Sequence, residues 1–328
     1  FIVDGELVFD EENVEAAVAG VRLTINGAQR PWSALFLANP SGRIRNATVR
    51  DCDFVNLNGS HALRGGSAIH GVSGNGLALS VLRCNFINNV SPGKGGAIRI
   101  DVGYFATVEY CEFSANQAIT GSSVVPMGGA ICVTSQRYAS RLLLLRSTFI
   151  NNISYQPGGA IGVEDASLVL EDCVIQGSRS AFGGIYPWSA GAGVFMCRWS
   201  GSHRDPVDLT IRGCRFQNNV GDLSAGTDAG DGGAVLVRGI ADRYIDVTVE
   251  QTDFMGNFNA QGAGLYIGRY ATGVVRSCRF RFNTSYANGG ATFKGGALAD
   301  NLGESATFVY CEFTGNRAGY DQLGNRTA

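Results

Sequence analysis

Lysine, proline and charged residues of either sign are scarce in this chain. Only Lys94 and Lys294 are lysines among the 26 basic residues, proline occurs 7 times in 328 residues, and charged residues make up 16% of the sequence. A reaction that needs a lysine base therefore has two candidates. The net charge of −2 does not indicate a nucleic-acid partner or binding to an anionic membrane surface.

Other absences argue against whole classes of protein. The sequence contains no run of 18 apolar residues, so no transmembrane helix is expected. It contains no Cys-x-x-Cys pair, so no zinc site is expected. Glycine is abundant, at 46 residues, but it lacks the period of three that collagen needs. No secretory signal is visible at Phe1, so we expect any export signal or anchor to lie outside this sequence.

What the sequence does contain is a short phrase that recurs nine times. Each copy has a small residue, then a large apolar residue two positions later, and usually asparagine three positions after that. The apolar positions are Phe54, Phe86, Phe113, Phe149, Ile175, Phe216, Phe254, Phe280 and Phe313. They recur every 26 to 41 residues, which is typical of an array of stacked units rather than an ordinary globular fold.

Each repeat is expected to contain three short strands with one buried face. In the second copy, alternating apolar residues predict strands over 77–81, 84–86 and 98–100, with a turn at Asn89. A glycine-rich phrase precedes the third strand of most repeats, and its copies begin at Gly95, Gly128, Gly158, Gly191, Gly232, Gly262 and Gly295. Such glycines suit a tight corner that needs positive φ or a close approach of two backbones.

These features predict an all-β fold, a right-handed parallel β-helix of about nine coils. Stacked coils place like residues about 4.8 Å apart, which predicts internal columns of phenylalanine, of small residues and of asparagine. In the asparagine column each side-chain amide can bond the next. A propeller or a sandwich is the alternative, but the widely varying loop lengths favour the solenoid.

The chain is expected to form one elongated domain with distinct ends. We expect residues 1–45 to form an N-terminal cap and the first coil, residues 46–318 the β-helix, and residues 319–328 a tail that continues in a longer protein or meets an assembly partner. Acidic residues followed by alanines between Asp10 and Gly20 predict a short capping helix. Such a helix would shield the exposed strand edges of the first coil.

The alternation of Gly-Gly-Ala-Ile (residues 95–98) with Phe-x-x-Asn (residues 86–89) resembles the polymorphic outer-membrane-protein repeat of chlamydial surface proteins. The resemblance covers roughly residues 45 to 318, and it is specific for the fold but only weakly specific for function. In that family the repeats form a secreted part that works in adhesion. The resemblance therefore implies an extracellular or cell-surface location, with a surface protein or a glycan as partner.

Cysteine and the glycosylation motif both follow the repeat. Seven of the nine cysteines occupy the small-residue column. Parallel side chains one coil apart keep their Cβ atoms beyond the usual disulfide range of about 3.5–4.5 Å, so buried free thiols are expected, although disulfides between coils stay possible. Three of six Asn-x-Ser/Thr motifs fall in the asparagine column, which leaves Asn46, Asn58 and Asn325 as the candidate glycosylation sites if the source is a eukaryote.

Two sets of loops vary in length, and they hold the candidate binding residues. One set lies between the asparagine column and the glycine phrase, and its long members are 117–127, 179–190, 220–231 and 284–294. The other set follows the glycine strand, and its long members are 134–141, 196–208 and 238–246. Aromatic residues that can form a strip for a sugar or a protein, or instead cover the ends of coils, are Tyr155, Tyr186, Trp188, Trp199, Tyr270 and Tyr286.

The resemblance and the lack of catalytic phrases favour a non-catalytic adhesin or structural scaffold, and no cofactor is expected. A polysaccharide lyase or hydrolase with a site on the long loops is one alternative, and its candidate residues are His203, Asp222, Asp228 and Asp231. The three aspartates are also a possible calcium loop, although a solvated loop is the more ordinary interpretation. A structural subunit of a larger extracellular assembly is the third possibility.

Overall fold

The structure is a computed structural model, and it describes residues 7–9, 16–26, 33–39, 46–59, 65–73, 77–101, 103–120, 125–135, 140–181, 191–198, 205–221, 232–240, 244–294 and 305–320. All regular secondary structure among these residues is β-strand. The strands form three sheets, and every pairing between neighbouring strands is parallel.

The sheets contain ten, eighteen and eight strands among the described residues. The ten-stranded sheet consists of β1 (Leu7–Phe9), β3 (Leu35–Asn39), β5 (Ile69–Ser73), β9 (Ile98–Asp101), β13 (Ile131–Thr134), β17 (Ile161–Glu164), β21 (Val194–Cys197), β25 (Val235–Arg238), β29 (Leu265–Ile267) and β33 (Thr292–Lys294). The eight-stranded sheet consists of β8 (Val90–Pro92), β12 (Gln117–Ile119), β16 (Ile153–Ser154), β20 (Arg179–Ser180), β24 (Val220–Gly221), β28 (Phe258–Gln261), β32 (Thr284–Asn288) and β36 (Arg317–Ala318).

The eighteen-stranded sheet has two columns of strands. The first column consists of β2 (Ala16–Asn26), β4 (Asn46–Val55), β6 (Leu77–Leu82), β10 (Tyr104–Glu109), β14 (Arg141–Leu145), β18 (Ser167–Glu171), β22 (Val207–Arg212), β26 (Ile245–Glu250), β30 (Ala271–Arg276) and β34 (Ala306–Val309). The second column consists of β7 (Asn85–Ile87), β11 (Glu112–Ser114), β15 (Thr148–Ile150), β19 (Val174–Gln176), β23 (Arg215–Gln217), β27 (Asp253–Met255), β31 (Arg279–Arg281) and β35 (Glu312–Thr314). Strand β4 runs through both columns, because it pairs with β6 and with β7.

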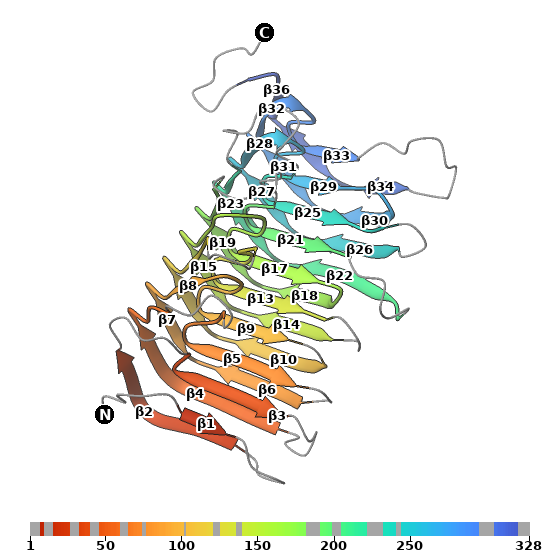
Figure 1. Cartoon of the computed structure of the whole chain (residues 1–328). Coiled ribbons are helices and arrows are strands. Elements are labelled where there is room, and N and C mark those ends of the chain that lie inside the picture. Colours follow the sequence, from red (N-terminus) through yellow and green to blue (C-terminus); the bar gives the residue numbers. More distant parts are fainter. Residues whose placement is uncertain are drawn as a thin grey trace.

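The chain therefore winds as a parallel β-helix, which confirms the fold predicted from the repeat. One coil passes in order through β10, β11, β12 and β13, and each of these strands pairs with its equivalent in the next coil, β14, β15, β16 and β17. Figure 1 shows the coils stacked along one axis, with β1 and β2 at one end and β36 at the other. Strands of one coil cannot bury their apolar face alone, so the core is shared along the whole stack.

The two short corners of each coil are built alike. From β6 to β36, the connection between the two columns of the eighteen-stranded sheet and the connection to the eight-stranded sheet each contain two residues. The first of the two has positive φ, as at Tyr110 (52°) and Ala115 (55°), and the second points inward into a column, as do Cys111 and Asn116. Positive φ is unusual for residues other than glycine, so the stacked columns hold these corners in place.

The asparagine column forms the predicted ladder. The Nδ2 of Asn116 donates to Oδ1 of Asn152 at 3.0 Å and to the carbonyl oxygen of Phe86 at 2.9 Å. Its own Oδ1 accepts from the backbone N–H and the side-chain amide of Asn89, at 3.1 and 2.9 Å. The same pattern connects Asn219, Asn257, Asn283 and Asn316. Every polar atom of a side chain like Asn116, which is fully buried, is therefore bonded.

The phenylalanine column also forms as predicted. Adjacent rings, from Phe54 to Phe149 and from Phe216 to Phe313, have centroids 4.6 to 5.1 Å apart and lie within 6° of parallel. This distance matches the spacing of strands in a sheet, about 4.8 Å. Ile175 interrupts the stack of rings, and from Phe54 to Phe280 the column is fully buried.

The two adjacent glycines that precede each strand of the ten-stranded sheet in most coils have separate structural roles. Gly95 has a φ of 69°, which a side chain would disfavour. A Cβ on Gly96 would collide with the carbonyl oxygen of Gly129 in the next coil. Both functions predicted for the glycine phrase are thus present, each at its own position.

Three details differ from the sequence-based expectation. Residues 16–20 belong to strand β2, so the helix predicted from Asp10 to Gly20 is wrong there, and residues 10–15 lie outside the described residues. The segment after the asparagine column is not simply a loop, because it begins with a strand of the eight-stranded sheet. The seventh glycine pair is Gly289-Gly290 rather than Gly295, because Thr292, and not a later residue, pairs with Leu265.

Candidate binding face

Both sets of variable loops border the ten-stranded sheet. The connections that enter this sheet range from three residues (262–264) to thirteen (181–193), and those that leave it range from two (165–166) to eleven (295–305). The other corners contain two residues throughout, from β6 to β36. The connections that vary in length therefore all lie where the strands of the ten-stranded sheet begin or end. We call these two sides, along which the strands begin and end, the two edges of this sheet. Loops on a rigid scaffold are the usual place for a binding surface.

The outward-facing residues of the ten-stranded sheet are unusually well buried. They alternate with core residues such as Ile98 and Ile131, so they point away from the interior. We call this surface the outer face; in strand order its central residues are His70, Arg99, Cys132, Gly162, Phe195, Leu236 and Tyr266. Exposure of Cys132, Phe195, Leu236 and Tyr266 is at most 8%. Met127, from the connection into β13, packs with them and lies over Gly162, which has no side chain in the way.

The outside of the eighteen-stranded sheet is different. It carries exposed ion pairs between coils, such as Arg83 with Asp51 at 2.6 Å and Arg146 with Glu109 at 2.9 Å. Pairs of this kind contribute little to stability because water screens them. The contrast sets the outer face of the ten-stranded sheet apart as the more enclosed surface of the rod.

A cluster of charged and polar side chains occupies one end of the outer face. Asp101 accepts hydrogen bonds from Thr134 at 2.6 Å and Arg99 at 2.9 Å, and it contacts the ring Nε2 of His70 at 3.0 Å. Burial opposes the charged carboxylate, but the hydrogen bond from His70 and the charge of Arg99 outweigh it and hold the pKa of Asp101 well below its usual range. The cluster is therefore a fixed ion network rather than a poised acid or base.

Lys94 was one of two lysines available as a base, and the structure places it in an ion pair. Its Nζ lies 2.6 Å from the carboxylate of Glu164, and both side chains are mostly buried. Burial lowers the pKa of Lys94, but the charge of Glu164 outweighs this and raises it overall. A lysine held in its charged form is a poor proton abstractor at neutral pH.

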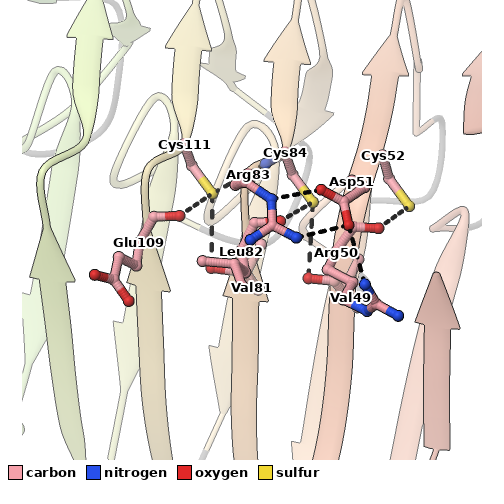
Figure 2. Close-up of polar contacts among 10 residues, drawn as sticks. All are labelled: Val49, Arg50, Asp51, Cys52, Val81, Leu82, Arg83, Cys84, Glu109 and Cys111. Carbon is pink, nitrogen blue, oxygen red and sulfur yellow. Dashed lines mark hydrogen bonds and ion pairs between the residues drawn. The ribbon is translucent and has the colours of Figure 1, made fainter. Parts of the chain in front are cut away.

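The cysteine column is a second hydrogen-bonded ladder at the first corner. In Figure 2 the sulfurs of Cys52, Cys84 and Cys111 lie in a row across neighbouring strands, each directed at backbone carbonyl groups. Each thiol donates to the carbonyl two residues before it, at 3.1 to 3.4 Å. Ser147 and Thr252, which stand in the same column, do the same at 2.8 Å. The column thus selects a small hydrogen-bond donor, not merely a small residue.

The cysteines are free thiols, as expected, and eight of the nine are buried. The hydrogen bond with Cys111, together with burial, outweighs the opposing hydrogen bond with Cys52 and raises the pKa of the Cys84 thiol to about 12. Burial raises the pKa of Cys132 to about 12 as well. Thiols with such pKa values have little thiolate at neutral pH, so they are structural rather than reactive groups.

The predicted aromatic strip is only partly described, and its described members do not lie together. Tyr155 and Tyr286 follow the asparagine column by three residues, on coils that are four apart, and Tyr155 is 37% exposed. Tyr270 lies at the opposite edge of the ten-stranded sheet, between β29 and β30, with a φ of 54°. Tyr186, Trp188 and Trp199 lie outside the described residues, as do His203, Asp222, Asp228 and Asp231.

The candidate glycosylation sites stay predictions. Asn46 is exposed at the start of β4, Asn58 is half-buried, and Asn325 lies outside the described residues. Asn89, Asn152 and Asn283 carry the same motif but are fully buried in the ladder, so they are not accessible to a glycosyltransferase.

Comparison with known proteins gives one match. Residues 83–101, which span β7, β8 and β9, match the model of the Chlamydia polymorphic membrane protein (Chlamydia_PMP) repeat. The Pmp-type repeat predicted from the sequence is thus found, and this repeat suggests a surface-associated protein. No curated protein and no solved structure matches the chain.

The described part of the chain contains no helix with the length and hydropathy that crossing a bilayer requires.

Proposed function

We propose that this chain is a non-catalytic surface β-helix that acts as an adhesin or structural scaffold through the variable loops that border the ten-stranded sheet. The observation that carries the proposal is the confinement of all variable connections to the two edges of the ten-stranded sheet. The surface association of the matched repeat family supports the same conclusion.

The internal columns suit this function physically. Ten stacked strands at about 4.8 Å give a sheet roughly 45 Å long. Hydrogen-bonded asparagines and stacked rings hold each coil in register with the next, so loops from many coils are presented in fixed order. A scaffold of this type presents an extended surface and tolerates changes in its loops.

A structural subunit of an extracellular assembly is a second candidate, and a specific observation favours it. The last described coil exposes large apolar side chains, with Phe308 at 37%, Phe313 at 49% and Tyr310 at 90%. Phe280 and Val275, the equivalents of Phe313 and Phe308 in the preceding coil, are fully buried, whereas Tyr310 stands at an outward corner where Tyr110 of an inner coil is also exposed. Apolar surface of this kind is covered either by further coils of a longer chain or by a protein contact, and the second case is the assembly candidate. The enzymatic alternative has its candidate residues outside the described part of the chain, and no described feature favours it.

Binding to cultured epithelial cells tests the adhesin proposal. We expect the fluorescently labelled chain to bind saturably, and a Tyr155→Ala, Tyr286→Ala double variant to bind about fivefold more weakly, because aromatic anchors at an interface often contribute about 1 kcal/mol or more. The matched control is Phe105→Ala, which removes an aromatic side chain that is 57% exposed on the eighteen-stranded sheet. Absence of saturable binding, or equal losses in both variants, would contradict the proposal.

For the assembly candidate, the measurement is the oligomeric state by sedimentation, comparing the chain with a Phe313→Ser variant. Self-association that this variant abolishes would support it, and a monomer at all concentrations would exclude assembly with copies of itself.

A further inference from the structure

A small cavity lies at the edge of the outer face, where three neighbouring strands of the ten-stranded sheet end. Its volume is about 170 Å³, and its lining includes Cys197 at the end of β21 and Arg198 after it, Arg238 at the end of β25, and Arg269 and Tyr270 after β29. The backbone holds these strand ends together, because Arg198 N–H donates to the carbonyl of Arg238 at 3.1 Å. The N–H of Gly239 donates to the carbonyl of Arg269 at 2.8 Å. Three successive coils thus each contribute one arginine to the same cavity.

The charged groups among the described lining residues of the cavity are all arginines. The carboxylate of Asp165 lies 3.8 Å from Nε of Arg198. Arg198 is 3% exposed, and its Nη1 also donates to the carbonyl oxygen of Tyr244 at 3.4 Å. Arg269 is exposed.

The size and lining of the cavity limit what can bind. Sites for whole drug-sized ligands are about 300–1,000 Å³, so this cavity takes one group of a larger molecule rather than the entire molecule. Guanidinium groups match planar or tetrahedral oxyanions with paired hydrogen bonds. Tyr270 adds an aromatic ring at the rim, in edge-to-face contact with Tyr244 at 5.9 Å, and such rings pack against the apolar faces of sugars.

We propose that this cavity binds an oxyanion group, a sulfate ester or a carboxylate, carried by an acidic polysaccharide. The inference rests on the proposed adhesin function and gives it a ligand class: an anionic glycan that lies along the edge of the ten-stranded sheet and inserts one charged group beneath Tyr270. Nucleic acid is a poorer fit, because a protein that binds a phosphate backbone needs many basic side chains along its surface, and this chain is slightly acidic as a whole.

Binding of defined oligosaccharides to the purified full chain tests the proposal. The probes are equal-length oligosaccharides of dextran sulfate, of polygalacturonate and of neutral dextran, measured by calorimetry at 0.15 M salt. We expect at least one anionic probe to bind about tenfold more tightly than neutral dextran, and the two anionic probes distinguish sulfate from carboxylate. Arg269→Gln should remove most of that preference, and Arg269→Lys should retain part of it, because lysine keeps the charge without the paired donors.

The matched control is Arg276→Gln. Arg276 is an exposed arginine of the same coil but lies at the end of β30 on the eighteen-stranded sheet, so its loss changes the net charge equally. We expect its affinity for the anionic probes to stay within twofold of the native chain. Equal losses in both glutamine variants would show general charge attraction and overturn the site.

The outcomes also separate this inference from the proposed function. If the native chain binds cells but shows no preference for either anionic probe, the cavity inference fails and the adhesin proposal stands. If an anionic probe binds in the cavity but the chain does not bind cells, the inference stands as a glycan site and adhesion fails. If neither is seen, both are wrong.

Discussion

Removal of the side chain of one asparagine from the ladder should destabilise the chain far more than removal of a neighbouring surface side chain. Asn116 is a suitable position, because it is fully buried and all of its ladder bonds are in the described part of the structure. In Asn116→Ala, two donors lose their acceptor, the backbone N–H of Asn89 and one N–H of its side-chain amide, and the carbonyl oxygen of Phe86 loses one of its two bonds, because β7 and β11 still pair. The Oδ1 of Asn152 keeps the bond from the Asn116 backbone at 3.0 Å.

The expected loss follows from the number of orphaned groups. Each buried donor or acceptor left without a partner costs about 1–3 kcal/mol, so two such groups cost about 2–6 kcal/mol if nothing relaxes. Water entering the space left by the side chain would bond one of them, so we expect a loss near the lower value, about 2 kcal/mol. Because repeats stabilise one another through their interfaces, the loss should be felt on both neighbouring coils.

Urea unfolding of the variant, followed by circular dichroism, measures the loss, and hydrogen exchange at the Asn89 amide localises it. The control is Ser114→Ala, which removes a half-buried outward-facing hydroxyl two residues away. A loss under about 1 kcal/mol for Asn116→Ala, or one equal to that of the control, would refute the idea that the ladder satisfies these buried groups. Unchanged exchange at Asn89 would do the same.

Two further predictions concern the ladder and the outer face. Ser178 occupies the asparagine column, and its buried Oγ has no hydrogen-bond partner among the described residues. We expect Ser178→Asn to join the two halves of the ladder, to stabilise the chain by about 1 kcal/mol and so to raise the midpoint of urea unfolding. A lower midpoint would show that the amide does not fit beside Ile175. The folded-state pKa of Asp101 lies below its unfolded value of about 3.9, so its contribution to stability is complete above that pH and is lost as the pH falls below it. Asp101→Asn should therefore be less stable than the native chain at pH 7 but lose less stability between pH 7 and pH 3. The control is Asp246→Asn, at an exposed position, and its stability should change with pH as that of the native chain does. A native-like pH profile for Asp101→Asn would contradict the assigned network.

The repeat columns were predictable because each column repeats one residue type at one position of the phrase. Phe86, Phe113 and Phe149 can be superposed from sequence alone, and stacking at the strand spacing then places the rings and the asparagines next to them. The eight-stranded sheet was missed because its strands are as short as Ile153–Ser154, too short for an alternating pattern.

The corners and the glycine register needed the structure. Nothing in the residue type of Arg83 or Tyr110 indicates positive φ, since the stacked backbone imposes it. Residues 289–296 contain two glycine pairs, and the choice between them depends on the close approach of Gly290 to the backbone of Arg317 in the next coil. A contact between residues so far apart in sequence leaves no local signal.

The candidate site was less predictable than the fold for the same reason. Three arginines on three different coils line the cavity, at positions 198, 238 and 269, and no spacing rule distinguishes them from the other arginines. Tyr270 lies on the connection between β29 and β30, at the opposite edge of the ten-stranded sheet from Tyr155 and Tyr286, so the described members of the expected aromatic strip are separated.

The most direct test of the proposed function is to measure whether the chain binds an acidic polysaccharide without cleaving it. The full chain would be incubated with dextran sulfate and polygalacturonate oligosaccharides, with and without calcium, and assayed for new reducing ends and for the absorbance of unsaturated uronate. We predict saturable binding with no product of either kind. Turnover of any of these substrates would contradict a non-catalytic binding protein and direct attention to the long loops instead.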